Sequence, residues 1–379
     1  MRTIHRRQTW ALLVLFAGFC ISLQGQADGL KVLNSFSYGT AAKKNDVLNT
    51  VSVCVDNSLL AAGATEDSPH RGGGRDVLLM KLDAKGRQVF MQTLGTPQDD
   101  IGTAVTELPN GQILVGGLTY QCTGKSDESQ CQISAWLRCR DAKGNNAWEK
   151  EKVLATDSKG KLYLGGLLVD KKARQVAIFG SKKGYFWACT ANYSGEKIQD
   201  KIFDRGIPEL EKLTIEKEVR AVMIDGFYYI FGGGRLSDRE DEWMPFVLKM
   251  DSELRILKAV VYPDIPAARI GQITDFGEGW LGITGAYWSN TTQNAFFLRI
   301  DTDLDKNTQR LIKNTAREDE FAAQMVRVNG PMYYLFGDIT AKTTAAKPDF
   351  FVTRYQNFDR KADDEKQMRS FSRSLSNKY

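Results

Sequence analysis

A short apolar run that ends in glycine recurs six times along the 379-residue chain, and this repetition constrains the fold more than any other feature. The copies end 52 to 63 residues apart, at Gly63, Gly117, Gly180, Gly233, Gly285 and Gly337. A second apolar run of strand length follows each copy, at Asp76–Asp83, Ser134–Asp141, Tyr185–Asn192, Met244–Asp251, Asn294–Asp301 and Asp349–Gln356. Such a period is typical of a fold made of successive copies of one supersecondary unit.

Each unit contains four segments with the composition of β-strands. In the second unit they are Gly102–Leu108, Gln112–Gly117, Ser134–Cys139 and Ala147–Leu154, and short turns join the first pair and the last pair. The runs are rich in β-branched and aromatic residues and lack the 3.6-residue periodicity of helices. Four antiparallel strands in each of six units predict an all-β fold, a six-bladed β-propeller with four-stranded blades.

The two ends of the chain predict how the ring closes. No apolar fourth strand follows the sixth copy, whereas Leu30–Asp46 has the pattern of the fourth-strand segment Gln88–Asp100. We therefore expect the N-terminal strand to pair with Asp349–Gln356 and to complete the last blade, which leaves no open sheet edge there. The propeller would span residues 28–358, and residues 359–379 would form a polar C-terminal tail.

The first 27 residues have the composition of a secretory signal peptide. Arg2, Arg6 and Arg7 precede the apolar run Trp10–Leu23, and small residues follow at Gly25-Gln26-Ala27. The run is shorter than the roughly 20 apolar residues of a membrane-spanning helix. We expect export, to the periplasm, the outer membrane or the exterior of a bacterium, without a transmembrane span in the mature chain. Lipidation of Cys20 stays open.

The charge of the mature chain argues against nucleic acid as a partner. Removal of residues 1–27 takes away three arginines and no acidic residue, so the formal net charge falls from +5 to +2. No run rich in lysine and arginine remains, whereas nucleic-acid-binding proteins concentrate such residues on one face.

The segment Asp76–Thr119 resembles the β-propeller repeat of bacterial exported and cell-envelope proteins. The shared pattern is Asp-apolar run-Lys-Leu-Asp-x-x-Gly, then Gly-x-x-x-Asp-Asp, then Asn-Gly-apolar run-Gly-Gly. The third unit departs from it, with Lys171-Lys172-Ala173 in place of Asn-Gly, and the last three units lack the Asp-Asp pair. The run YYIFGGG is also weakly similar to kelch repeats. The resemblance implies a fold and an envelope location, but no reaction, because propellers have many functions.

Residues that would carry catalysis are few. His70 is the one histidine after residue 27, so a site with several histidine ligands is excluded, and a Ser/His/Asp hydrolase would depend on that residue. Carboxylates before first strands are candidates for a glycosidase pair or for calcium ligands, namely Asp99, Asp100, Glu318, Asp319 and Glu320. Turn capping is the interpretation that we favour for them. We therefore predict no enzyme activity and no cofactor, with calcium left open.

The cysteines divide into two groups. Cys122 and Cys131 flank one polar loop, nine residues apart, and predict a disulfide in an oxidising compartment. Cys54, Cys139 and Cys189 lie within strand patterns and are expected to be buried thiols.

Loop lengths predict which face binds a partner. The connections from second to third strand and between blades are longer than the turns on the other face, for example Glu66–Arg75, Arg235–Trp243 and Ala286–Asn294. These long loops carry aromatic and arginine residues of the kinds enriched in interfaces: Arg71, Arg75, Tyr120, Arg235, Arg239, Trp243, Tyr287 and Trp288. The alternative, that some of the aromatics pack between blades, stays open for Trp243.

The sequence therefore predicts a non-catalytic module of the cell envelope that binds or scaffolds a protein through its long-loop face. The alternative is a carbohydrate-binding or carbohydrate-active propeller, which would stack sugars on the same aromatics and cut them with a carboxylate pair. A glycosidase needs two carboxyl groups about 5–10 Å apart, so the geometry of the centre of the ring discriminates between the two.

Overall fold

The structure is a computed structural model, and every regular element in the part of the chain that it describes is a β-strand. It describes residues 31–38, 46–67, 74–122, 131–204, 207–215, 219–236, 239–262, 267–277, 279–289, 292–305, 307–312, 323–329, 332–339 and 349–356. The predicted signal peptide, residues 1–27, and the predicted tail, residues 359–379, lie outside these residues.

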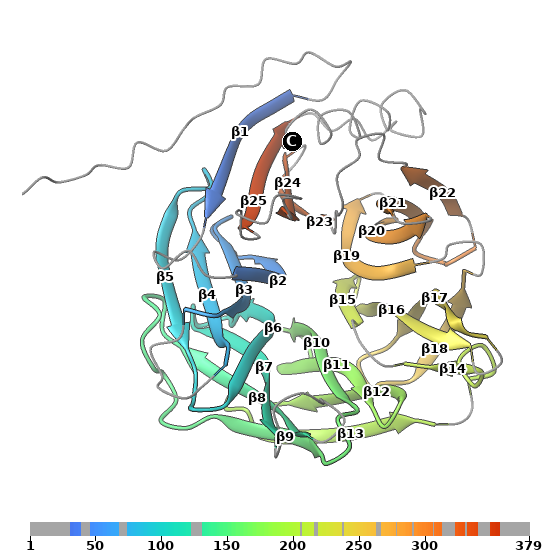
Figure 1. Ribbon diagram of the computed structural model, residues 1–379, viewed down its shortest axis with the longest axis horizontal. Helices are drawn as coiled ribbons and strands as arrows, with labels where there is room; N and C mark the ends of the chain where they lie inside the picture. Colours follow the sequence, from blue (N-terminus) through green and yellow to red (C-terminus); the bar gives the residue numbers. More distant parts are fainter. Residues whose placement is uncertain are drawn as a thin grey trace, which may run out of the picture.

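The strands form six separate antiparallel sheets arranged around a common centre (Figure 1). The innermost strands are β2 (Asp46–Val53), β6 (Asp99–Glu107), β10 (Leu162–Asp170), β15 (Val219–Ile224), β19 (Ala267–Gly277) and β23 (Ala323–Asn329). The second strands are β3 (Leu59–Thr65), β7 (Ile113–Cys122), β11 (Gln175–Lys182), β16 (Phe227–Leu236), β20 (Trp280–Ser289) and β24 (Met332–Ile339).

The outer half of each sheet follows the same order. The third strands are β4 (Asp76–Leu82), β8 (Cys131–Arg140), β12 (Tyr185–Ala191), β17 (Arg239–Met250), β21 (Thr292–Asp301) and β25 (Asp349–Gln356). The outermost are β5 (Gln88–Leu94), β9 (Lys152–Asp157), β13 (Lys197–Phe203), β18 (Ile256–Val261), β22 (Asn307–Ile312) and β1 (Lys31–Tyr38). The predicted β-propeller of four-stranded blades is confirmed, except that β14 (Leu213–Thr214) adds a fifth strand to the sheet of β15–β18.

The ring closes as the sequence predicts. Five sheets are made of consecutive strands, and the remaining one joins the two ends of the chain. In that sheet β1 pairs antiparallel with β25, from Lys31 opposite Gln356 to Tyr38 opposite Phe350. The innermost strands contact one another in the order β2, β6, β10, β15, β19, β23 and back to β2.

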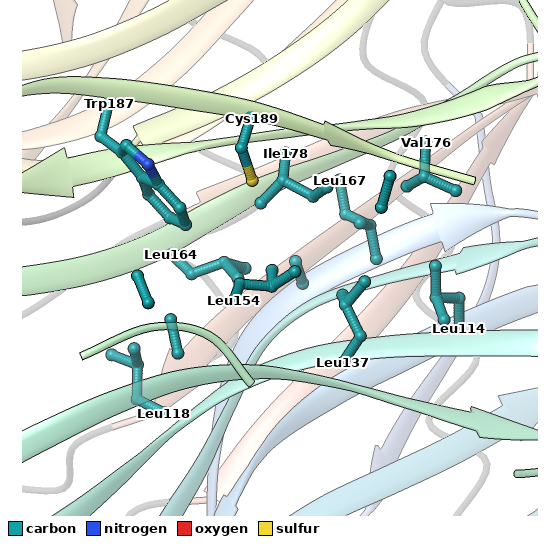
Figure 2. Close-up of a cluster of buried hydrophobic side chains, with 14 of the residues drawn as sticks. Leu114, Leu118, Leu137, Leu154, Leu164, Leu167, Val176, Ile178, Trp187 and Cys189 are labelled. Atoms are coloured by element: carbon teal, nitrogen blue, oxygen red, sulfur yellow. The ribbon is translucent and has the colours of Figure 1, made fainter. Parts of the chain in front are cut away.

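Hydrophobic cores lie between neighbouring blades. In the largest cluster, leucines of β7 and β8 pack against residues of β10–β12, including Leu164, Ile178 and Trp187 (Figure 2). The inner strands of the two sheets in such a contact are apolar on both faces, because each is covered by the blade before it and the blade after it. Burial between blades therefore explains the continuous apolar runs of the repeat.

The repeat glycines have a steric role. A Cβ on Gly63 would lie 1.9 Å from the carbonyl oxygen of Val47, and one on Gly180 would lie 1.9 Å from that of Tyr163. Real Cβ atoms essentially never approach a backbone oxygen so closely, so a larger residue would push the first and second strands apart. Close packing against the backbone of the innermost strand therefore requires glycine at this position.

Two local predictions are wrong. The fourth strand of the second blade is β9 at Lys152–Asp157, not Ala147–Leu154, because Ala147 and Trp148 pack against the core cluster while their amides bond to Cys139. The expected loops Arg235–Trp243 and Ala286–Asn294 are mostly strand. Their aromatic residues favour extended structure, so β16 continues to Leu236 and β20 to Ser289.

Candidate functional site

A cavity of about 480 Å³ lies at the centre of the ring, between the innermost strands. Its described lining comes from five of them, at residues 50–53 of β2, 104–106 of β6, 165–168 of β10, 220–222 of β15 and 272–275 of β19. Thr50 and Arg220 at one end are buried, whereas Val53, Val222 and Asp275 at the other are half-buried, so the cavity opens toward the short turns that follow the innermost strands.

The cavity wall is rich in backbone polar groups. Each innermost strand stands at the end of its sheet and has a strand partner on one side only. An edge strand presents a row of N–H and C=O groups on its unpaired side. Five of the innermost strands are also irregular, because the pairing with the second strand shifts at Leu48/Thr50, Gly102/Ala104, Leu164/Gly166, Ile270/Ile273 and Arg327/Asn329. Such bulges are common next to functional sites.

Arg220 is the charged residue at the buried end of the cavity. It is 4% exposed, although it belongs to β15 and lies beside an open space. Its Nη1 donates to the hydroxyl of Tyr163 at 3.0 Å and to the carbonyl of Val219 at 3.2 Å. Its Nη2 donates to the carbonyl of Asn49 at 2.8 Å. Asn49 lies in β2, on the opposite side of the ring, so this side chain links inner strands across the centre.

The surroundings of Arg220 depend on a glycine and a bulge. A Cβ on Gly165 would lie 2.2 Å from the carbonyl oxygen of Val219 and 2.8 Å from Nη1 of Arg220. Glycine at this position therefore leaves room for the guanidinium. Asn49 is the bulged residue of β2, and its carbonyl accepts the hydrogen bond from Nη2 of Arg220. Its side-chain amide donates to the carbonyl of Gly102 at 2.9 Å.

Two polar atoms of the lining have no hydrogen-bond partner among the described residues. They are Nε of Arg220, a donor, and Oε1 of Gln272, an acceptor, and both are buried. A buried polar group without a partner costs about 1–3 kcal/mol, so native structures seldom leave one unexplained. Both atoms have almost no accessible surface, so a molecule in the cavity does not reach them directly.

Asp275 is the one carboxylate among the described residues that line the cavity. Its Oδ1 accepts a hydrogen bond from the amide of Gly277 at 2.6 Å, which stabilises the end of β19. The described lining therefore holds one acidic group and one basic group, and not the pair of carboxylates that a glycosidase uses.

The carboxylates singled out in the sequence have other partners. Asp99 forms an ion pair with Arg75 at 2.7 Å and accepts a hydrogen bond from the amide of that residue at 2.6 Å. Asp100 accepts hydrogen bonds from the amide and hydroxyl of Thr96, as expected for turn capping. Neither residue lines the cavity. Glu318, Asp319 and Glu320 lie outside the described residues.

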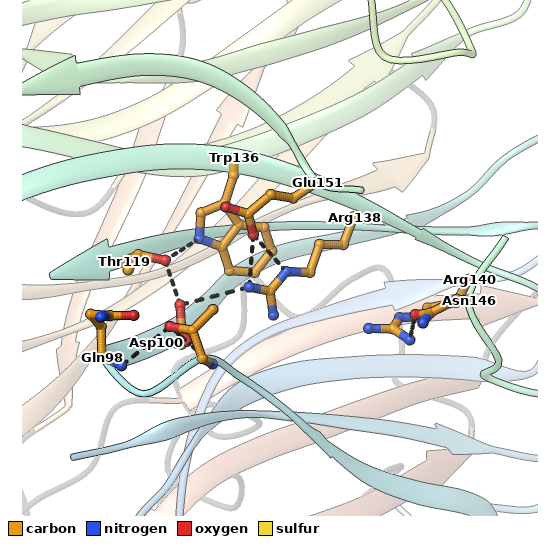
Figure 3. Close-up of polar contacts among 9 residues, drawn as sticks. Gln98, Asp100, Thr119, Trp136, Arg138, Arg140, Asn146 and Glu151 are labelled. Atoms are coloured by element: carbon orange, nitrogen blue, oxygen red, sulfur yellow. Dashed lines mark hydrogen bonds and ion pairs between the residues drawn. The ribbon is translucent and has the colours of Figure 1, made fainter. Parts of the chain in front are cut away.

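Asp100 belongs to a buried network in the second blade (Figure 3). The hydroxyl of Thr119 donates to Asp100 and accepts a hydrogen bond of 2.8 Å from the indole N–H of Trp136. The guanidinium of Arg138 lies over the Trp136 ring, 4.2 Å from its centroid, and pairs with Glu151 at 2.7 Å. This arrangement fixes side chains within one blade, and its donors already occupy both carboxylate oxygens of Asp100.

Four of the predicted partner-binding residues have side chains that the structure describes. Tyr120 is half-buried and packs against the core cluster between two blades, and Arg75 pairs with Asp99. Arg235 lies over the ring of Trp243, 5.1 Å from its centroid, on adjacent strands.

The side chains of the other predicted partner-binding residues are not described. Arg239, Tyr287 and Trp288 lie in strands β17 and β20, but their side chains are outside the described part, as are Arg71 and His70. A role of these eight residues in binding stays a prediction.

The cysteine predictions are confirmed. Cys122 and Cys131 form a disulfide between β7 and β8, with Cα atoms 4.0 Å apart. Cys54, Cys139 and Cys189 are buried free thiols. Burial raises the pKa of the Cys54 and Cys139 thiols from 9.0 to about 11, and it raises the pKa of Cys189 further.

Among the described residues, no cluster of three or more His, Cys, Asp or Glu side chains could hold a metal ion. In the same part of the chain, no helix is long and apolar enough to span a membrane.

Sequence reasoning missed the residues that line the cavity. Arg220, Gln272 and Asp275 lie in apolar first-strand segments that carry no catalytic motif. Their proximity comes from the ring, which places residues of five blades around one space.

Solved structures that resemble this chain agree with the propeller. No protein-family model and no curated protein matches the sequence. A protein of unknown function from Dyadobacter fermentans superposes with a TM-score of 0.60 at 7% identity, over 87% of this chain and 100% of that one. The NanB sialidase from Streptococcus pneumoniae gives 0.58 at 9% identity, over 87% and 71%. An α-L-arabinanase from Penicillium chrysogenum, complexed with arabinobiose, gives 0.56 at 9% identity, over 85% and 98%.

These similarities establish the fold alone, because the identities are far below those at which function follows. The β-propeller part of the predicted resemblance is confirmed, and no sequence family is identified.

Proposed function

We propose that this protein is a carbohydrate-binding β-propeller whose ligand occupies the central cavity. The observation that carries the proposal is the cavity itself, whose described lining combines the unpaired edges of innermost strands with polar side chains at Thr50, Ser52 and Gln272. Its volume of about 480 Å³ lies within the range of ligand pockets, about 300–1,000 Å³.

A sugar suits the chemistry of the wall. Sugar hydroxyls both donate and accept hydrogen bonds, and the edges of the innermost strands offer backbone groups of both kinds. Gln272 adds a carboxamide to the lining, and Thr50, Ser52 and Thr106 add short polar side chains. Two solved structures of similar fold are a sialidase and an arabinanase complexed with arabinobiose, which also favours a carbohydrate.

Binding without cleavage is the form of the proposal that the cavity favours. The described lining has Asp275 as its one carboxylate, whereas hydrolysis of a glycosidic bond generally uses two. Hydrolysis remains the second candidate, because the sialidase and the arabinanase are enzymes with this fold. The earlier prediction, protein binding through the long-loop face, is not confirmed and has less support.

Export is part of the proposal. The N-terminal segment has the pattern of a signal peptide, and the Cys122–Cys131 disulfide is compatible with an oxidising compartment.

The test is a glycan array followed by calorimetric titration of the glycans that bind. Gln272→Ala should weaken binding about ten-fold, since it removes one hydrogen bond in a buried site. Gln199→Ala, on the outermost strand β13, is the matched control and should leave the affinity unchanged. Failure of every glycan to bind, or equal losses in the two variants, would refute the proposal. Release of reducing sugar that Asp275→Asn abolishes would show the second candidate to be correct.

A further inference from the structure

We propose a second binding site, for one phosphate or sulfate group, in a small cavity in the outer part of the ring between the first two blades. The cavity has a volume of about 150 Å³. Its described lining comes from Gly95, which follows β5 of the first blade, and from the second blade, at residues 138–140 of β8 and at 146 and 148–151 of the connection before β9. None of these residues lines the central cavity, so the two sites are separate.

Positive charge is in excess in the described lining. Arg138, Arg140 and Lys150 contribute three cations, whereas Glu149 and Glu151 contribute two carboxylates. Glu151 is already paired with Arg138 at 2.7 Å. Within the described part of the chain, neither Arg140 nor Lys150 forms an ion pair, although Arg140 is half-buried. An anion in the cavity would therefore bring a charge that the lining lacks.

Arg140 is the cation of this lining with the least compensation. Its Nη1 donates to Oδ1 of Asn146, which is uncharged. Burial lowers the pKa of the Arg140 guanidinium, and the nearby positive charge of Arg138 lowers this pKa further. Both effects act against the charged form, which arginine nevertheless keeps at neutral pH. A bound anion would offset this cost, because it would place the opposite charge beside a guanidinium that has no carboxylate partner among the described residues.

Both arginines have donors that a molecule in the cavity can reach (Figure 3). Positions 138 and 140 are two residues apart in β8, so their side chains lie on the same face of the blade. Nη1 of Arg138 and Nη2 of Arg140 form no hydrogen bond with any described residue, and both keep accessible surface. Nε of Arg140 is enclosed, so it takes no part in the site. The accessible donors are therefore the terminal nitrogens of two neighbouring guanidinium groups.

The size of the cavity and the origin of its donors favour a phosphate or sulfate group. At about 150 Å³ the cavity is smaller than the pockets of about 300–1,000 Å³ that hold drug-sized ligands, so its occupant is small. Arginine binds such oxyanions through charge-assisted hydrogen bonds. Donors come from β8 and, through Lys150, from the connection before β9. This arrangement suits a tetrahedral anion, whose oxygens point in several directions, better than a planar carboxylate.

Calorimetric titration of the protein with phosphate, sulfate and acetate at constant ionic strength tests the site. Phosphate and sulfate should bind at one site, and acetate should bind at least ten-fold more weakly. Arg140→Gln should weaken phosphate binding about ten- to a hundred-fold, as expected for loss of a charge-assisted hydrogen bond. Arg140→Lys, which keeps the charge, should recover part of the affinity. Arg255→Gln, the same substitution in an exposed turn after β17, should change nothing.

A second variant keeps the test valid even if Arg140→Gln fails to fold. Lys150 is exposed, so Lys150→Gln should fold, and it should weaken phosphate binding several-fold. Because the anion could be free or an ester group of a larger ligand, methyl phosphate and methyl sulfate are titrated beside the free ions, and binding of either form supports the site.

Three results would overturn the inference. They are the absence of saturable binding by all of these phosphates and sulfates, an affinity for acetate equal to that for phosphate, and a phosphate affinity that Arg140→Gln leaves unchanged. Glycan binding in the central cavity should be the same in Arg140→Gln and in the wild type, so the two proposals stand or fall separately.

Discussion

Replacement of Asp100 by alanine should destabilise the protein strongly, because this carboxylate is fully buried and organises its surroundings. It accepts hydrogen bonds from the amide of Thr96 at 2.5 Å, from the hydroxyl of Thr96 at 2.7 Å and from the hydroxyl of Thr119. Nη2 of Arg138 lies 3.8 Å from one of its oxygens. Alanine would leave these donors without their acceptor and Arg138 without one of its two carboxylate neighbours.

The magnitude follows from the number and kind of partners lost. Each buried donor left unsatisfied costs about 1–3 kcal/mol, and removal of one partner from a buried ion pair costs about 3–5 kcal/mol. The costs overlap here, because the Thr119 hydroxyl can turn to another acceptor and Arg138 keeps Glu151. We therefore expect Asp100→Ala to lower the free energy of unfolding by about 3–5 kcal/mol.

Urea denaturation followed by tryptophan fluorescence measures this effect. Asp83→Ala is the control, because Asp83 also caps a turn, by accepting from the amides of Lys85 and Arg87, but at an exposed position where water can replace it. Its cost should be about 1 kcal/mol or less. The double variant Asp100→Ala/Thr119→Val should lose less than the sum of the single losses, because the two residues share one network. Equal losses for Asp100→Ala and Asp83→Ala would refute the argument.

Three further predictions concern closure, the disulfide and a buried thiol. Deleting residues 28–44 removes β1 and exposes the edge of β25, so the protein should aggregate or melt at a lower temperature than the full chain. Deletion of the tail 359–379 should have little effect. Light scattering during a thermal ramp measures the aggregation of the two variants. Reduction of Cys122–Cys131 should lower the free energy of unfolding by about 2–3 kcal/mol, which urea titration with and without reductant checks, and no difference would contradict it. The free energy of unfolding should fall as the pH rises from 9.0 toward about 11, because the unfolded chain releases the Cys54 proton at the ordinary pKa while the folded chain retains it. Cys54→Ala should reduce this fall in urea titrations across that pH range. An identical fall in the variant and the wild type would contradict the assignment to Cys54.

The features that the sequence predicted well are those encoded locally or by repetition. The apolar runs and their spacing predicted the blades, because each strand is buried between two neighbours and therefore reads as a continuous apolar segment. The disulfide was predictable because Cys122 and Cys131 end adjacent strands of one hairpin. Closure by β1 followed from the absence of a fourth strand at the other end of the chain.

The loop predictions failed for a physical reason. Polar residues between apolar runs were interpreted as long loops, but in two blades strand pairing extends through them, with one aromatic residue in each of the pairs involved. Arg235 pairs with Trp243, and Tyr287 pairs with Asn294, so two expected binding loops are extensions of strands. Sequence polarity alone does not distinguish an exposed hairpin end from a loop.

The cavity residues could not be predicted from single segments of the sequence, because they come together from distant parts of the chain. Arg220 meets the carbonyl of Asn49, which is 171 residues earlier in the chain, and the ring geometry creates that contact. Neither residue belongs to a recognisable motif, and their strands carry the same apolar pattern as the others.

The repeat nevertheless marks where the cavity lies. In four blades the repeat glycine pairs with the residue just before the bulge of the innermost strand: Gly63 with Leu48, Gly117 with Gly102, Gly180 with Leu164 and Gly285 with Ile270. The carbonyl of the preceding residue occupies the space of the missing side chain in the blades of Gly63, Gly117 and Gly180. The glycine is therefore fixed by backbone geometry, whereas the bulged residue beside it is free to vary.

Three blades illustrate this freedom at the bulged position. The residue there is Asn49 in β2, Thr103 in β6 and Gly165 in β10. Asn49 supplies a carbonyl to Arg220, and Gly165 supplies the room that its guanidinium occupies. One repeated backbone thus holds different chemistry at the same place in different blades. Substitution of a repeat glycine by alanine should therefore disturb the fold, whereas Asn49→Ala should leave the carbonyl and its bond to Arg220 in place and remove the side-chain bond to Gly102. A larger loss of stability for Asn49→Ala than for Gly63→Ala in urea titrations would show that the bulge is held by the side chain and not by the glycine.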